Sequence, residues 1–248
     1  MRRDKKIDLS LIRRKMLSLG LPVLVFAMTA SASNVTTVTP PGSSTSGPVA
    51  ASATFITGLG FVNVTLTDLE INPNDVGQLL SGLSFTLSNG ATAGTLFSST
   101  ATQITVNSGG TYSLANSPGP AGWGLNNNVS GGLQLDALGF IGPAGLIIGP
   151  PGAGGTYSNA NSSIAGNPAH NPFLSKSVTF IIDIAGVTSA TTVTSATFAF
   201  GTTPGQFLVK GCVSTDPSCG LSQVPEPVSL VLTGSGLIGL LFLRRRRA

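Results

Sequence analysis

The sequence predicts an all-β protein, an antiparallel β-sandwich of jelly-roll-like or Greek-key type, on three observations. Apolar and polar residues alternate in several short runs, which is the pattern of strands that bury one face. The 32 glycines and 16 prolines supply many turns between these runs. Outside the two ends of the chain, no run has the 3.6-residue period of an amphipathic helix. Short strands joined by frequent turns are typical of sandwich folds.

The alternating runs mark the candidate strands in chain order. Their apolar positions are Val62, Val64 and Leu66; Leu83, Phe85 and Leu87; Ile104 and Val106; Leu133, Leu135 and Ala137; Val178, Phe180, Ile182 and Ile184; and Ala196, Phe198 and Phe200. Asn89-Gly90 and Ser108-Gly109-Gly110 predict turns after the second and third runs. Residues 139–177 are rich in Gly, Pro and Asn, so we expect a long loop there.

The N-terminus predicts a secretory signal peptide over residues 1–32. A basic segment (1–15), an apolar segment (16–30) and the small-residue site Ala30-Ser31-Ala32 follow one another in the order of such signals. We therefore expect an N-terminal signal helix, passage through the Sec translocon, and cleavage by signal peptidase after Ala32. Arg13-Arg14 leaves twin-arginine export open as an alternative. Residues 33–48, rich in Ser, Thr and Pro, are expected to be a disordered leader before an ectodomain over 49–221.

Residues 222–248 consist of three parts. These are the motif Val224-Pro225-Glu226-Pro227, an apolar run over 228–243, and the cluster Arg244-Arg245-Arg246-Arg247. The apolar run predicts a transmembrane helix of about 24 Å, slightly shorter than a ~30 Å hydrocarbon core. The arginines form a stop-transfer cluster that holds the C-terminus on the cytoplasmic side.

This order resembles the PEP-CTERM sorting signal of Gram-negative bacteria, which the membrane protease-transpeptidase exosortase recognises. The resemblance implies transient anchoring in the inner membrane, processing near the Pro-Glu-Pro motif, and delivery to the cell surface, the outer membrane or the extracellular matrix. An ordinary single-pass anchor is the alternative. Residues 157–167, 170–174 and 198–205 also resemble uncharacterised ectodomains that carry such a tail, which implies a shared fold with no activity attached.

The distribution of charge argues against a nucleic-acid partner. Of the 13 lysines and arginines, only Lys176 and Lys210 lie between residues 33 and 223, alongside six carboxylates. Binding to phosphates needs a clustered basic face, which this region lacks. Its surface must instead be hydrated by the hydroxyls and amides of its many Ser, Thr and Asn residues.

Few residues of the predicted ectodomain offer metal or redox chemistry. Cys212 and Cys219 are the only cysteines, and in an exported protein they predict a disulfide. Asp68, Glu70 and Asp75 are candidate calcium ligands, because they belong to a cluster with oxygen ligands at alternate positions. The spacing departs from the EF-hand pattern, so a solvated turn is the alternative, and we expect no cofactor.

The inventory of catalytic groups is equally short. His170 is the only histidine, and the chain contains no Gly-x-Ser-x-Gly motif. A secreted hydrolase would require Asp136 or Asp183 to converge with His170 or with each other. Glycosidase clefts are also usually lined by aromatic rings, whereas this chain has one Trp and two Tyr.

We therefore expect an exported protein without enzymatic activity. The sorting resemblance implies a structural or adhesive role in exopolysaccharide and biofilm. The alternative is a glycan-binding or ice-binding module that uses its Thr-rich strands or its long loop. A flat row of outward threonines on neighbouring strands would favour that alternative, and a secreted hydrolase ranks third.

Overall fold

The computed structural model describes residues 31–38 and 46–213, with side chains from residue 46 onward. Within these residues the regular secondary structure is almost all β-strand, which confirms the predicted β-rich class. The strands are β1 (Ser31–Val38), β2 (Ala50–Gly58), β3 (Phe61–Asp68), β4 (Leu80–Leu87), β5 (Thr95–Val106), β6 (Tyr112–Leu114), β7 (Gly124–Val129), β8 (Gly132–Asp136), β9 (Ile147–Ile148), β10 (Phe173–Asp183), β11 (Val193–Phe200), β12 (Phe207–Lys210) and β13 (Cys212–Val213). Two single-turn 3-10 helices, η1 (Val76–Gln78) and η2 (Pro143–Gly145), are the only helical segments in the described ranges.

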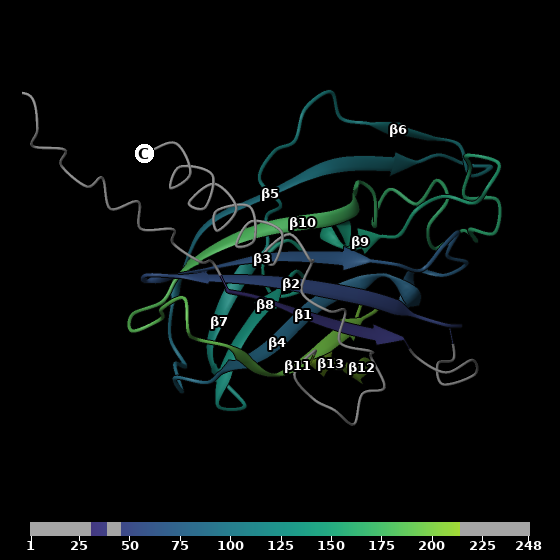
Figure 1. The fold of residues 1–248 in the computed structure, drawn as a ribbon. Helices are drawn as coiled ribbons and strands as arrows, with labels where there is room; N and C mark the ends of the chain where they lie inside the picture. Colours follow the sequence, from purple (N-terminus) through teal and green to yellow (C-terminus); the bar gives the residue numbers. More distant parts are fainter. Residues whose placement is uncertain (1–30, 39–45, 214–248) are drawn as a thin grey trace, which may run out of the picture.

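The strands form one mixed sheet that divides into two groups. One group contains β6, β5, β10, β3, β2, β1 and β13, and the other contains β12, β11, β4, β8 and β7. The two-residue strand β9 joins the groups, because it pairs antiparallel with β4 and parallel with β10. Figure 1 shows β5, β10, β3 and β2 crossing the view, with β7, β8, β4 and β11 below them.

The two groups of strands enclose a shared hydrophobic core. Alternate residues are buried along β2 and β3 and along most of β11, as the period-2 pattern predicts. The rings of Phe55 on β2 and Phe85 on β4 lie 5.2 Å apart, so side chains from the two groups meet in the interior. Trp123 similarly packs against Phe180 of β10, with ring centroids 5.4 Å apart. Burial of each large side chain contributes about 1.5–3 kcal/mol.

Several elements differ from the predictions. Residues 31–38 pair with β2 as strand β1, whereas we expected residues 33–48 to form a leader without regular structure. Strand β2 escaped prediction because its inward residues include Ala51 and Ala53, which give little apolar contrast with their Ser and Thr neighbours. The expected loop over 139–177 contains η2, β9 and the first residues of β10.

The predicted export and sorting segments are at the two ends of the chain. Among the described residues, no helix has the length and apolar character needed to cross a bilayer. The predicted signal segment up to Ala30 and the predicted sorting tail over 222–248 lie outside the described residues. Ala32, the predicted cleavage position, lies in β1.

Candidate functional site

A set of outward hydroxyl side chains crosses the first group of strands in register. The first row consists of Thr54 on β2, Thr65 on β3, Thr179 on β10 and Thr100 on β5. The second row consists of Ser52, Thr67 and Ser177 on the first three of these strands. We call these residues the threonine face. Residues that alternate with them, such as Phe55, Val64 and Phe180, are fully buried, so the rows point away from the core.

The hydroxyls of the threonine face are available for external partners. No hydrogen bond joins any of their side chains to another described residue. On the other group of strands, by contrast, Thr86 bonds to the hydroxyls of Thr194 and Ser195, each at 2.7 Å. The two surfaces carry similar residues, but only the threonine face leaves its hydroxyls uncommitted within the described structure.

One end of the threonine face is interrupted by a three-residue bulge in β10. Leu174 pairs with Gln103 of β5, and the next partners are Val178 and Ala101. Ser175, Lys176 and Ser177 therefore stand opposite the single residue Thr102. At this point β10 also changes its other neighbour from β9 to β3. Bulges of this kind bend a strand and redirect its side chains.

The bulge forms one side of a groove of about 270 Å³. Its lining consists of Thr102, Ile104, Tyr112, Leu114, Pro151, Tyr157, Ser175, Lys176 and Ser177. Ligand pockets usually span about 300–1,000 Å³, so this groove suits a group no larger than about one sugar ring. Ser177 belongs to both the groove and the threonine face, which makes the two surfaces continuous.

Two tyrosines give the groove a rigid aromatic wall. Tyr157 is buried and donates its hydroxyl hydrogen to the carbonyl oxygen of Gly149 at 2.9 Å. Burial raises the pKa of Tyr157, so its hydroxyl stays protonated. Tyr112 meets the Tyr157 ring edge-on, with centroids 5.6 Å apart, and keeps about a third of its surface exposed (36%). The fixed inner ring therefore supports an outer ring that a ligand can touch.

Among the described residues that line the groove, only Lys176 has a charged side chain. Its backbone adopts the left-handed conformation (φ 62°), which a residue with a Cβ adopts only at an energetic cost. The side chain is exposed and forms no ion pair with a described residue. The bulge thus places Lys176, which has no ion-pair partner among the described residues, in the same groove as the aromatic wall.

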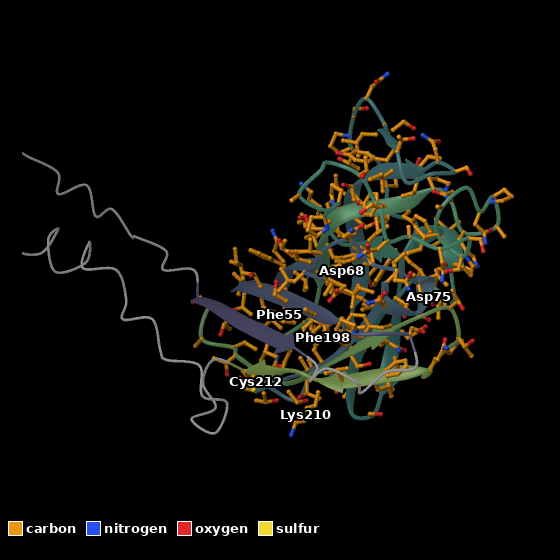
Figure 2. The ribbon with its side chains drawn as sticks, turned by 90° about the vertical axis from the view of Figure 1, so that its right-hand side faces the viewer. Phe55, Asp68, Asp75, Phe198, Lys210 and Cys212 are labelled. Atoms are coloured by element: carbon orange, nitrogen blue, oxygen red, sulfur yellow. The ribbon has the colours of Figure 1, made fainter. Side chains whose placement is uncertain are left out.

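Asp68, labelled in Figure 2, is buried at the end of β3, a strand that contacts β9. Its Oδ1 accepts a hydrogen bond from the backbone N–H of Glu70 at 2.9 Å, while Oδ2 has no partner among the described residues. Burial raises the pKa of this carboxyl well above its usual value, and the nearby charge of Glu70 adds to the effect.

The structure does not assemble the predicted calcium ligands. Within the described ranges, no three His, Cys, Asp or Glu side chains gather into a possible metal site, so Asp68, Glu70 and Asp75 do not meet around a common point. Asp75 instead caps η1: it accepts hydrogen bonds from Gly77 N (2.8 Å) and Asn161 Nδ2 (2.8 Å). The solvated-turn alternative also fails for Asp68, which is buried.

The candidate catalytic groups likewise lie in separate places. Asp136 ends β8 and accepts hydrogen bonds from the backbone N–H groups of Leu138 and Gly139. Asp183 ends β10, and His170 Nδ1 lies 2.6 Å from the carbonyl oxygen of Ser163 in the preceding loop. Each group has a local structural role or stands at a strand end, and the described structure does not gather them.

Only one of the two cysteines of the predicted disulfide lies among the described residues. Cys212 belongs to β13 and is disulfide-bonded. Cys219 lies outside the described residues, so the Cys212–Cys219 pairing stays a prediction.

The groove was not foreseen from the sequence. Tyr112 and Tyr157 are distant along the chain, and the sequence shows only that aromatic rings are few. Nothing in the alternation around Lys176 marks the bulge, although its charge in a nearly uncharged region was a signal. Compared with known protein families, characterised proteins and solved structures, the chain has no significant match.

Proposed function

We propose that the protein is an exported, non-catalytic surface or matrix protein that binds extracellular polysaccharide through its threonine face. The in-register row from Thr54 to Thr100 carries this proposal, because its hydroxyls have no hydrogen-bond partner among the described residues. A row of this kind is the feature that favours a binding module over a purely structural role.

The dimensions of the threonine face suit an extended hydrated polymer. Neighbouring strands lie about 4.8 Å apart, so a row across four strands spans about 14 Å. Each hydroxyl contact contributes only about 0.5–1.5 kcal/mol, since it replaces a contact with water. Ile56 and Phe61, which belong to the same strands, add exposed apolar surface for the C–H faces of sugars. Binding would therefore be weak at each contact and additive along a chain.

The route to the surface follows from the predicted sorting elements. In this proposal the signal peptide directs export through Sec, and exosortase processes the tail near Glu226 before surface delivery or release. The fold class that accompanies the proposal is an antiparallel β-sandwich, in which β9 joins the two groups of strands at one edge. Polysaccharide and biofilm are the setting that the sorting resemblance implies.

Isosteric substitutions test the threonine face. In a Thr65→Val/Thr179→Val variant, two hydroxyls are lost while strand propensity and volume are kept. We expect at least about a threefold loss of retention on the neutral polysaccharide dextran in affinity electrophoresis, with little change when salt is raised. Thr86→Val/Thr194→Val is the matched control on the other group of strands. Equal retention of both variants and the unaltered protein, or no retention of any, would overturn the proposal.

Ice is the second candidate ligand, and the same row of threonines favours it. A flat array of methyl and hydroxyl groups can also order water molecules at a solid surface. An ice recrystallisation assay separates the two ligands. Inhibition that disappears in Thr65→Val/Thr179→Val, without retention on polysaccharide, would favour ice over glycan.

A further inference from the structure

We propose that the groove beside the threonine face is a subsite for one acidic sugar, a uronic acid, within the bound polysaccharide. Lys176 would bind its carboxylate, and Tyr112 would contact the C–H face of its ring. This inference rests on the proposed function and deepens it by naming the substrate class. It concerns the groove alone, so it can fail while binding at the threonine face survives.

The charge of the groove selects an anionic group. Lys176 forms no ion pair with a described residue, and every other lining side chain is uncharged. A carboxylate that enters would gain a charge-assisted hydrogen bond from Lys176 with no internal competitor. Thr102, Ser175 and Ser177 line the same groove, and their hydroxyl groups would hydrogen-bond to the remaining sugar oxygens.

The aromatic wall supplies the second recognition element. Tyr112 contributes a partly exposed ring whose orientation is held by the edge-on contact with the buried Tyr157. A pyranose ring has an apolar C–H face that packs well against such a surface. The volume of about 270 Å³ admits one ring and little more, which excludes a large cofactor or a folded partner.

The bulge explains how the charged Lys176 and the aromatic wall come to line one groove. In regular pairing, each residue of β10 would stand opposite one residue of β5. Here the three residues Ser175, Lys176 and Ser177 stand opposite the single residue Thr102. The left-handed backbone at Lys176 is part of this geometry. Strained residues of this kind are concentrated at ligand-binding sites, where they place a side chain that regular structure would direct elsewhere.

Continuity with the threonine face identifies the acidic sugar as one unit of a longer chain. Ser177 ends the second hydroxyl row and also lines the groove. A polysaccharide lying along the rows would therefore reach the groove without changing direction. Neutral units would contact the hydroxyl rows, and one acidic unit would occupy the groove.

Calorimetry on the full-length protein tests this inference with paired ligands and paired variants. The probes are polygalacturonate oligosaccharides and the same oligosaccharides after reduction of their carboxyl groups. We expect the unaltered protein to bind the acidic probe about five- to tenfold more tightly, the range of one charge-assisted contact that is partly exposed. Lys176→Gly should abolish this preference, and Lys210→Gly, in β12, should keep it.

Two further measurements separate a binding role from a structural one. Lys176→Gly should unfold at the same or a higher temperature, because glycine adopts the left-handed conformation without cost. Tyr112→Ala should weaken both probes equally, while Tyr112→Phe should retain both affinities. Equal binding of the two probes by the unaltered protein, or a preference that survives Lys176→Gly, would overturn the inference. The proposed function is judged separately, by the neutral polymer and the threonine variants.

Discussion

Burial gives Asp68 an acid-base behaviour opposite to that of a surface carboxylate. Its Oδ2 has no partner among the described residues, and desolvation raises its pKa well above the usual value. The folded protein therefore retains a proton that the unfolded chain releases above about pH 4. The stabilising contribution is complete below the unfolded pKa and is lost as pH rises toward the raised folded pKa.

Asp75 contributes with the opposite sign. Although partial burial acts to raise its pKa, hydrogen bonds from Asn161, Gly77 and Ser163 hold the pKa below its usual value. Its stabilising contribution is present above the unfolded pKa and is lost as pH falls through the folded pKa. The two aspartates therefore act in adjacent pH windows, Asp75 below about pH 4 and Asp68 above it.

The pH dependence of unfolding provides the corresponding prediction. Between about pH 4.5 and neutrality, the free energy of unfolding should fall in the unaltered protein and fall less steeply in Asp68→Asn, which cannot ionise. Urea midpoints at several pH values measure the two slopes. The slope is the decisive quantity, because the amide also changes the local hydrogen bonds at every pH. Identical slopes would show that Asp68 is ionised in the folded state.

At the scale of elements, the junction between β3 and β9 requires close approach of two backbones. Gly149, which follows β9, lies against the carbonyl group of Glu70, just beyond the end of β3. A Cβ on Gly149 would collide with that carbonyl oxygen, and also approach Oδ1 of Asp68 to 3.2 Å. The same residue accepts the hydrogen bond of the Tyr157 hydroxyl, so the junction also supports the floor of the groove.

Gly149→Ala should therefore destabilise the protein by about 2 kcal/mol or more, since backbone atoms cannot move aside as a flexible side chain can. Gly154→Ala is the matched control in the same loop, because open space surrounds that position. We expect the control to change stability by less than about 0.5 kcal/mol. Chemical denaturation of the three proteins makes the comparison. Similar midpoints for both variants would mean that the two backbones are not closely packed.

The strands with strong apolar contrast were predictable from the sequence. The alternation around Phe85, Leu133, Phe180 and Phe198 corresponds to β4, β8, β10 and β11, because large inward residues make the period-2 pattern visible. The turn at Gly90 was predictable for a similar local reason, since its φ of 71° favours glycine.

Features that depend on pairing between distant segments were not predictable. The row of threonines exists only because the registers of β2, β3, β10 and β5 coincide, and sequence alternation does not determine register between strands. The groove depends on a bulge and on the meeting of Tyr112 with Tyr157, which no local pattern encodes. Asp68 belongs to a polar stretch, and its burial follows from the packing of β9 over the end of β3.

At the scale of the whole molecule, charge is concentrated at the two ends of the chain. Eleven of the 13 basic residues lie in the first fifteen or last five positions. Lys210 and Cys212 lie near the lower edge of the sheet in Figure 2, at the end of the described chain. The body between the ends therefore offers few charges, consistent with the salt-insensitive binding proposed for the threonine face.

The Arg cluster gives a prediction about processing of the whole protein. Replacing Arg244 to Arg247 with serine removes residues that each cost about 2.5–3.5 kcal/mol at the centre of a bilayer. We expect the variant to remain unprocessed or to be misrouted, as measured by intact mass of the exported fraction. Glu226→Ala/Pro227→Ala tests the motif in the same assay. Normal C-terminal trimming of the serine variant would contradict the stop-transfer role.

Strand β1 has a consequence for the timing of export. Its eight residues pair with β2 from Ser31–Thr57 to Val38–Ala50, and Val35 also pairs with Val213 of β13. The bond that signal peptidase is expected to cut, between Ala32 and Ser33, lies inside this ladder. A protease must hold its substrate as an unpaired extended segment, so cleavage has to precede closure of the sheet. Threading of an unfolded chain through Sec satisfies that order, whereas a precursor folded before twin-arginine transport would enclose the bond. If the signal peptide is cut after Ala32, as predicted, the pairing of this one strand requires its removal first and completion of the sheet second.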